Sequence, residues 1–323
     1  MTDFAYSRPS TLDEARAALA ESGSVAIGGG TDLLVLIDEG LASPKRVVDL
    51  RAIPGAREIR HLPDGDLRLG GGVRIADLAS DATVRAEFPL LADASASVGT
   101  PALRNMGTLA GNLLQRPRCW YFRRGVKCFK NGGTQCAAVE GEHQYHGIIA
   151  SGTCRAVHPS DPAVALLALD ARVEIAGANG DLRELGIEAF FEGAAANATG
   201  ETALAPGEII TAVIIPSASA GGSQHWAKLM QRGAWDFALV SCAATRRRDG
   251  LVRMALGGVG ASPWRVPLSI EEDVASGDLD EESFDALAER AMYDAEPLTG
   301  TTYKVTQAQT LLRRAMRAFQ PTN

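Results

Sequence analysis

Ala26-Ile27-Gly28-Gly29-Gly30-Thr31-Asp32-Leu33-Leu34 is the stretch of this chain that decides its fold. It predicts a short strand at residues 24–27, a tight glycine turn, and a buried helix with Thr31-Asp32 at its N-terminus. Free backbone N–H groups at such a turn can bind a phosphate. The turn is not a Rossmann fingerprint, because Leu33 replaces the third glycine of G-x-G-x-x-G, and no P-loop lysine follows. An ordinary tight turn is the alternative.

Outward from this turn, strands and helices mix along the chain, which predicts an α+β protein. The predicted strands are 24–27, 46–49, 59–62, 66–69, 173–175, 208–215, 224–229, 237–248 and 251–259, and the predicted helices besides the one after Asp32 are 11–22, 75–80, 90–97, 163–169, 281–295 and 306–319. Helix N-caps are expected at Ser10 or Thr11, at Asp161-Pro162 and at Asp280. Asp249-Gly250 predicts a hairpin, and the small residues 217–223 predict a linker between domains.

Composition excludes several classes of protein. The 323 residues exceed one compact core, so two or three domains are expected, and a net charge of −7 gives no basic field for a nucleic-acid partner. No apolar run approaches the roughly 20 residues of a membrane span. The N-terminal residues resemble neither a secretory signal nor a twin-arginine leader, so cytoplasmic synthesis is expected.

A second loop dense in glycine and small polar residues covers residues 99–112. Arg104-Asn105-Met106-Gly107-Thr108-Leu109-Ala110-Gly111-Asn112 is its densest part. Such a loop can bend closely around a ligand, although a surface loop with ordinary turn chemistry is the alternative. Two loops suited to phosphate in one region indicate a cofactor that carries a pyrophosphate.

Four of the five cysteines, Cys119, Cys128, Cys136 and Cys154, lie within 36 residues that are rich in arginine and lysine. Five cysteines are too few for a disulfide scaffold in a chain of this length. None forms a C-x-x-C pair, so zinc is disfavoured. Four thiolates can hold a 2Fe-2S or a 4Fe-4S cluster, and buried free thiols are the bland alternative. Cys242, in an apolar strand, is expected in the core.

The basic residues of this segment are Arg116, Arg118, Arg123, Arg124, Lys127 and Lys130, and no acidic residue occurs from 115 to 139. We hypothesise that this run offsets the negative charge of a thiolate-ligated cluster and, in addition, forms part of a subunit contact. His143, His146 and His158 lie nearby and are expected to form hydrogen bonds rather than ligate a metal.

At these residues the chain resembles the FAD-binding subunits of the molybdenum hydroxylases, the family of xanthine dehydrogenase, aldehyde oxidoreductase and carbon monoxide dehydrogenase. Residues 26–34 look like its first FAD loop, 104–112 like its second, and Ser160-Asp161 like its isoalloxazine-side motif. Residues 207–216 and 226–228, with Arg232 and Asp236, are similar to the end of its FAD region and the start of its C-terminal domain. Residues 115–154 look like a subgroup, typified by bacterial periplasmic aldehyde oxidoreductase, that carries a 4Fe-4S cluster beside the flavin.

The resemblance implies a two-part FAD-binding domain of the PCMH type. A small βαβ lobe covers residues 1–55, and a larger α+β lobe covers 56–216 with an inserted iron–sulfur segment at 115–158. A C-terminal domain of antiparallel sheet and helices covers 224–323. The implied ligands of the 4Fe-4S cluster are Cys119, Cys128, Cys136 and Cys154. The implied FAD contacts are Ala26, Ile27, Gly28, Gly29, Gly30, Thr31, Asp32, Leu33, Leu34, Asn105, Thr108, Gly111, Asn112, Asp161 and Lys228.

The function that the resemblance implies is electron transfer. In such a complex, electrons pass from a molybdenum cofactor in a large subunit through 2Fe-2S clusters in a small subunit to FAD in this chain, and then to a final acceptor. A heterotrimer or its dimer is expected, and a partner with a twin-arginine leader could carry it to the periplasm. The alternatives are a self-contained FAD oxidase or reductase, and a zinc-stabilised module without redox function. No catalytic side chain is predicted.

Overall fold

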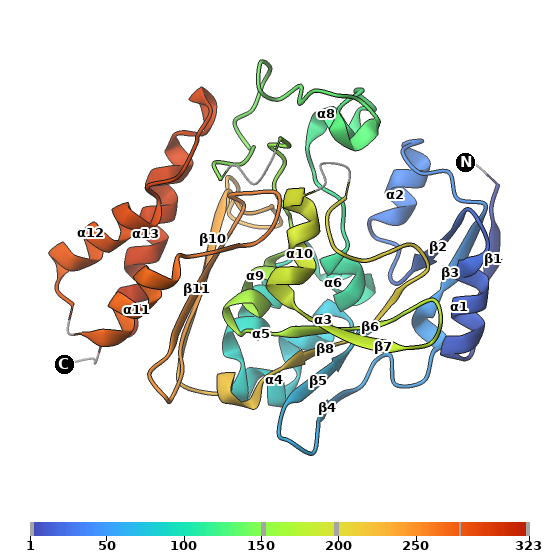
Figure 1. Cartoon of the computed structure of the whole chain (residues 1–323), viewed down its shortest axis with the longest axis horizontal. Coiled ribbons are helices and arrows are strands. Elements are labelled where there is room, and N and C mark those ends of the chain that lie inside the picture. Colours follow the sequence, from blue (N-terminus) through green and yellow to red (C-terminus); the bar gives the residue numbers. More distant parts are fainter. Residues whose placement is uncertain (1–2, 150–152, 197–199, 278, 321–323) are drawn as a thin grey trace.

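The computed structural model describes residues 3–149, 153–196, 200–277 and 279–320, and it confirms the α+β class (Figure 1). A parallel sheet of order β1-β3-β2 begins the chain. The strand, glycine turn and helix around Gly29 form the predicted β2-α2-β3 unit of this sheet. Its elements are β1 (Ala5–Ser7), α1 (Leu12–Ala20), β2 (Ser24–Ile27), α2 (Leu33–Asp38) and β3 (Arg46–Asp49).

A second sheet has the order β4-β5-β8-β6-β7, and all of its strand pairs are antiparallel. Its strands are β4 (Ile59–His61), β5 (Leu67–Gly70), β6 (Arg172–Ala176), β7 (Leu182–Gly186) and β8 (Ile209–Ile215). Short helices connect them: α3 (Ile75–Ser80), α4 (Ala82–Glu87), α5 (Pro89–Ala96), α6 (Pro101–Met106), α7 (Leu109–Leu113), α8 (Trp120–Arg123), α9 (Asp161–Ala168) and α10 (Ile187–Ala196). The apolar β8 is the central strand of this order, and it is buried along most of its length.

The third sheet has the order β12-β11-β10-β9. Its strands are β9 (Ser223–Leu229), β10 (Val240–Arg246), β11 (Val252–Gly257) and β12 (Trp264–Arg265), followed by α11 (Leu268–Ser276), α12 (Glu281–Ala291) and α13 (Tyr303–Arg317). β10 is buried on both faces: Ala243 packs with α9, whereas Cys242 and Ala244 pack with the C-terminal helices. The predicted hairpin at Asp249-Gly250 joins β10 to β11, and Cys242 is in the core as predicted.

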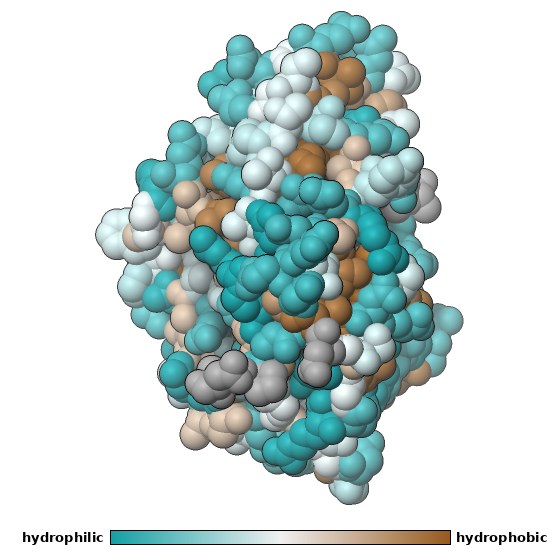
Figure 2. Space-filling model, turned by 90° about the vertical axis from the view of Figure 1, so that its left-hand side faces the viewer, coloured by the Kyte–Doolittle hydropathy of each residue, from teal (hydrophilic) through white to brown (hydrophobic). Residues whose placement is uncertain are grey.

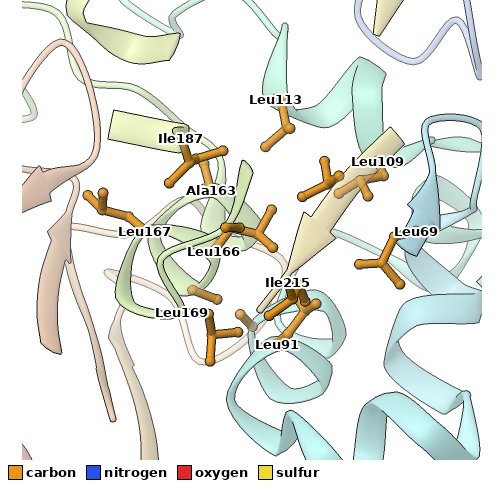
Figure 3. Packing of buried hydrophobic residues seen from close by; sticks show 14 of the residues in the cluster. Leu69, Leu91, Leu109, Leu113, Ala163, Leu166, Leu167, Leu169, Ile187 and Ile215 are labelled. Carbon is orange, nitrogen blue, oxygen red and sulfur yellow. The ribbon is translucent and has the colours of Figure 1, made fainter. Parts of the chain in front are cut away.

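The main hydrophobic core surrounds α9, whose eight residues are all buried. Figure 3 shows Leu166 and Leu167 of this helix among leucine and isoleucine side chains from several elements, including Leu109 and Ile215. The molecule therefore has layers: the second sheet, then α5 and α9, then the third sheet, then α11 to α13.

The outer face formed by the C-terminal helices is mostly hydrophilic (Figure 2). Small separate apolar patches interrupt it, as is usual for a protein surface. Within the described residues, no helix combines the length and apolar character that crossing a membrane requires.

Every strand and helix expected from the sequence is present, with ends displaced by a few residues. Thr11 and Asp280 are N-caps as predicted. The predicted cap at Asp161 is wrong, because Ser160 Oγ accepts from Ala163 N–H at 3.1 Å and is the N-cap of α9.

The predicted linker at residues 217–223 packs against the core at Ser219. This buried residue donates from Oγ to the carbonyl of Leu169 at 2.9 Å, so its small side chain serves packing rather than mobility. The division into domains proposed from the sequence stays a prediction. The short helices α4, α6, α7, α8, α10 and α11 and the strands β1, β7 and β12 were not expected, because tertiary contacts rather than a long apolar period stabilise short elements.

Candidate functional site: two glycine loops beside a cysteine cavity

The two glycine-rich loops lie directly against each other. A Cβ atom at Gly28 would overlap the hydroxyl of Thr108, and one at Gly29 would overlap the carbonyl oxygen of Met106. Gly30 has φ +74°, a left-handed conformation that favours glycine. The triple glycine therefore allows the first loop to pack on the second.

The first loop presents unpaired donors. Among the described residues, the backbone N–H groups of Gly30, Thr31 and Asp32 donate to no other protein group. The Thr31 side chain is exposed beside them. Adjacent free N–H groups on an exposed loop are suited to the oxygens of a phosphate. This arrangement fits the pyrophosphate of FAD.

Some of the other implied FAD contacts lie in or around the two loops, and others lie in the N-terminal core. Thr108 caps α7 by accepting from Gly111 N–H at 3.3 Å, and Asn112 Oδ1 accepts from Ser160 Oγ, so the second loop is tied to the start of α9. Ala26, Leu34 and Asn105 are exposed around the loops, whereas Ile27 and Leu33 pack in the N-terminal core. The structure thus brings the two loops together, but Ile27 and Leu33 contribute mainly to packing.

Asp161, at the start of α9, and Lys228, in β9, form a buried ion pair. Lys228 Nζ donates to Asp161 Oδ2 at 2.7 Å and to the carbonyl of Ser97 at 3.0 Å, and both side chains are less than a tenth exposed. Burial raises the pKa of Asp161, and the ammonium of Lys228 opposes that shift. The pair connects α9 to β9.

A cavity of about 320 Å³, partly open to solvent, lies beside Asp161. Sequence reasoning missed several of its lining residues: Arg118, His158, Phe237 and Ser241. Ser241 Oγ is buried and has no hydrogen-bond partner among the described residues. Its register position opposite Lys228 was the available signal, because β9 and β10 come from consecutive predicted strands, which commonly pair. The cavity combines apolar walls with polar groups, as cofactor pockets do.

Asp32 has a role that its position in the first loop did not predict. Its side chain does not cap α2. Instead it accepts from the backbone N–H of Arg116 at 2.8 Å and from the guanidinium groups of Arg118 and Arg123. Burial raises the pKa of Asp32, but these donors outweigh it and hold the pKa below its usual value. Asp32 therefore fastens the cysteine segment to the first glycine loop.

The four clustered cysteines line one cavity, although they are 8 to 35 positions apart in the sequence. The cavity has a volume of about 310 Å³ that includes some open solvent space, and α8, at the top of Figure 1, contributes Tyr121 and Phe122 to its lining. Of the described residues that line it, Lys130 is the one cation, and none is a carboxylate. Its lining residues are Cys119, Tyr121, Phe122, Cys128, Phe129, Lys130, Cys136, Ala137, Ala138, Cys154 and Ala156.

The thiols are not arranged as a compact single-ion site. Within the described ranges, no group of three or more His, Cys, Asp or Glu residues could hold a metal ion, and all five cysteines are free. Burial raises the pKa of Cys119 to about 11, and it also raises the pKa of Cys154. Four cysteines lining one cavity supply the type and number of donors that an iron–sulfur cluster uses.

Much of the basic charge in the cysteine segment is paired within the chain. Arg118 and Arg123 pair with Asp32, while Arg116 and Lys130 pair with Glu201 at 2.9 and 2.7 Å. These carboxylates come from parts of the chain far from the basic run. Internal ion pairs therefore involve four of the six cations, and the hypothesis that the run offsets the charge of a cluster stays a prediction.

The three histidines near the cysteines form hydrogen bonds, as expected. His143 Nδ1 lies 2.9 Å from the carbonyl of Ala138, and His158 Nε2 lies 3.2 Å from the carbonyl of Leu113. His146 Nε2 lies 3.2 Å from Cys119 Sγ. Burial lowers the pKa of both His146 and His158 to about 4, so both rings are neutral at physiological pH.

The glycine loops and the fold define a class of FAD-binding oxidoreductase subunit, and comparison with known proteins agrees. Residues 2–218 match the family described as "FAD binding domain in molybdopterin dehydrogenase". The chain belongs to this family, the FAD-binding subunits of molybdenum hydroxylase-type oxidoreductases.

Individual relatives match over nearly the whole chain. It is 37% identical to the aldehyde oxidoreductase FAD-binding subunit PaoB of Escherichia coli, over 97% of this chain and 96% of that one. It is 27% identical to the carbon monoxide dehydrogenase medium chain of Hydrogenophaga pseudoflava, over 98% and 96% of the two chains. Among solved structures, carbon monoxide dehydrogenase from that organism, in a form lacking the Mo-pyranopterin moiety, has a TM-score of 0.76 at 25% identity, covering 98% and 96%.

Proposed function

We propose that this chain is an electron-transfer subunit that holds FAD between its glycine loops and a 4Fe-4S cluster in the cysteine cavity. The observation that carries the proposal is the convergence of Cys119, Cys128, Cys136 and Cys154 on one cavity. The segment bearing them is fastened to the first glycine loop through Asp32. Both cofactors would then lie in adjoining parts of one domain.

The residues of the chain would bind and orient these groups. The N–H groups of Gly30, Thr31 and Asp32 would hold the pyrophosphate, and the Asp161–Lys228 pair and Ser241 would face the flavin in the adjacent cavity. FAD, when bound, supplies two-electron exchange that can be split into single electrons. The protein contributes positioning, exclusion of water, and hydrogen bonds that adjust the potential.

We further propose that the electrons come from partner subunits. These partners would be a large subunit with a molybdenum cofactor and a small subunit with 2Fe-2S clusters. Support comes from the names of the relatives, which are a "FAD-binding subunit" and a "medium chain" of larger enzymes. Co-expression with candidate partners, followed by size-exclusion chromatography, tests the assembly. Cell fractionation with and without a twin-arginine-bearing partner tests export to the periplasm.

The cofactor proposal is tested on the purified chain by measuring flavin, iron and acid-labile sulfide. We expect one FAD and about four irons and four sulfides per chain. Changing any of Cys119, Cys128, Cys136 or Cys154 to Ala should remove most of the iron. Cys242→Ala is the matched control, because Cys242 lies in the core away from the cavity.

Three outcomes would contradict the proposal. FAD without iron would remove the cluster and leave the flavoprotein. Zinc without flavin would favour the binding module. Oxidation of an organic substrate by the isolated chain would favour a self-contained oxidase.

A further inference from the structure

His146 lies in contact with one of the four clustered cysteines, and the proposed function gives it no role. Its ring is 3% exposed and lies beside the cysteine cavity. Nε2 lies 3.2 Å from Cys119 Sγ. Within the described residues, the sulfurs of Cys128, Cys136 and Cys154 have no comparable side-chain donor, so Cys119 is distinguished from the other three.

Contacts on several sides hold the His146 ring in place. Trp120 packs edge-on to it, with ring centroids 5.4 Å apart at 75°, and Tyr121 lies on another side at 6.2 Å. The His146 N–H donates to the carbonyl of His143 at 2.9 Å. The carbonyl of the preceding residue, Tyr145, accepts from the buried Lys304 Nζ at 3.1 Å. The ring therefore cannot easily turn away from the sulfur.

The chemistry of the contact determines which way the hydrogen bond runs. A neutral imidazole has one N–H and one lone pair. When Cys119 is a thiolate ligand, a lone pair on Nε2 would face a negatively charged sulfur at contact distance. The tautomer with the proton on Nε2 avoids that repulsion and donates to the sulfur instead.

We infer that His146 donates an Nε2–H hydrogen bond to the Cys119 sulfur and thereby raises the reduction potential of the iron–sulfur cluster. The inference rests on the cluster proposed above. Reduction adds negative charge that is shared by the ligating sulfurs, and a donor pointing at one of them stabilises the reduced state more than the oxidised state. His146 is a positioning residue in this sense, because it acts through Cys119.

The test is an EPR-monitored redox titration of the full purified chain and its variants. His146→Leu replaces the imidazole ring with an apolar side chain of moderate size and removes the N–H donor. In this variant we expect the equilibrium for one-electron reduction to shift against the reduced cluster by about tenfold, or about 59 mV. His146→Gln retains a side-chain N–H and should recover part of the shift. His143→Gln is the matched control, because His143 is in the same segment but contacts no cysteine sulfur.

A second measurement does not depend on any variant folding. Wild-type protein labelled with nitrogen-15 histidine should show hyperfine coupling of that nucleus to the reduced cluster in pulsed EPR. Absence of this coupling, or equal potentials in wild type and His146→Leu, would overturn the inference while leaving the cluster in place. Absence of iron and sulfide in the wild-type chain would overturn both this inference and the proposed function.

Discussion

At the scale of single residues, small size and buried charge decide what each loop can do. Gly28 and Gly29 have no room for a side chain, because the second loop packs directly against them. The absence of a Cβ atom therefore allows the two loops to meet beside backbone N–H groups suited to phosphate. Asp49, at the end of β3, shows how a buried charge is stabilised by its hydrogen-bond partners. It is fully buried, and its carboxylate is satisfied by Tyr6 and Arg51 at 2.6 to 2.9 Å.

Gly29→Ala should disrupt the contact between the loops. Because the new methyl would overlap the backbone oxygen of Met106, relief requires movement of main chain rather than of a side chain. We expect the purified variant to lose most of its flavin, measured by absorbance after denaturation. Gly186→Ala is the control, since a Cβ there meets nothing within 4 Å. Full flavin content in Gly29→Ala would contradict this packing.

Asp49→Asn should destabilise the protein at neutral pH by about 2 kcal/mol, because charge-assisted hydrogen bonds are replaced by neutral ones. Burial raises the pKa of Asp49, but hydrogen bonds from Arg51 and Tyr6 outweigh it and lower the pKa from 3.8 to about 2. A carboxylate whose pKa is lower in the folded state stabilises the fold at pH values above its pKa in the unfolded state. This contribution is lost as the pH falls toward the pKa of the folded state.

The difference in unfolding free energy between wild type and Asp49→Asn should therefore be constant from pH 7 to about pH 5 and shrink below about pH 4. Urea denaturation at several pH values measures it. Asp285→Asn, at an exposed pair with Arg313, is the control and should change stability little. A difference that does not depend on pH would show that charge is not the cause.

At the scale of elements, the cysteine segment depends on contacts from outside itself. In the parts of 115–158 that the structure describes (115–149 and 153–158), its regular structure is limited to α8 and one short 3-10 helix at Phe129–Asn131. Its position is set by ion pairs to Asp32 and Glu201 and by hydrogen bonds to the carbonyls of Val259 and Gly260, which follow β11. A segment with few helical or strand hydrogen bonds opens readily when such anchors are removed.

Asp32→Asn should loosen this segment without unfolding the protein. Loss of the charged acceptor for Arg118 and Arg123 should raise local opening by about tenfold, equivalent to about 1.4 kcal/mol. Trypsin cleavage at Arg118, Arg123 and Arg124, followed by mass spectrometry, measures this opening. Asp13→Asn, at an exposed pair with Arg16, serves as the control. Unchanged cleavage rates would mean that other contacts hold the segment.

At the scale of the whole molecule, α9 is the shared element. It packs against both large sheets, and the Asp161–Lys228 pair joins its first turn to β9. Arg265 and Arg253 make similar connections to Asp170 just beyond its end. The cavity beside Asp161 is therefore built from residues on both sides of the residue 217–223 segment.

Lys228→Met should destabilise the protein by about 3 to 5 kcal/mol, because it leaves the buried carboxylate of Asp161 without its partner. The double variant Lys228→Met/Asp161→Leu should recover much of that loss, since no unpaired charge remains. Urea denaturation measures the double variant and both single variants, Lys228→Met and Asp161→Leu. If the double variant were as unstable as the sum of the two single variants, the pair would not be coupled.

The sequence alone determined the α+β class, the strand–glycine–helix unit, the hairpin at Asp249-Gly250 and the family, because these depend on residues near one another in the chain. Tertiary structure decided which groups meet. Asp32 binds Arg116, 84 positions away, instead of capping its own helix, and Ser241 lies in the cavity through strand register. The cysteines could be grouped by sequence, but only folding places them around one cavity, since the chain between them has little regular structure to fix their spacing.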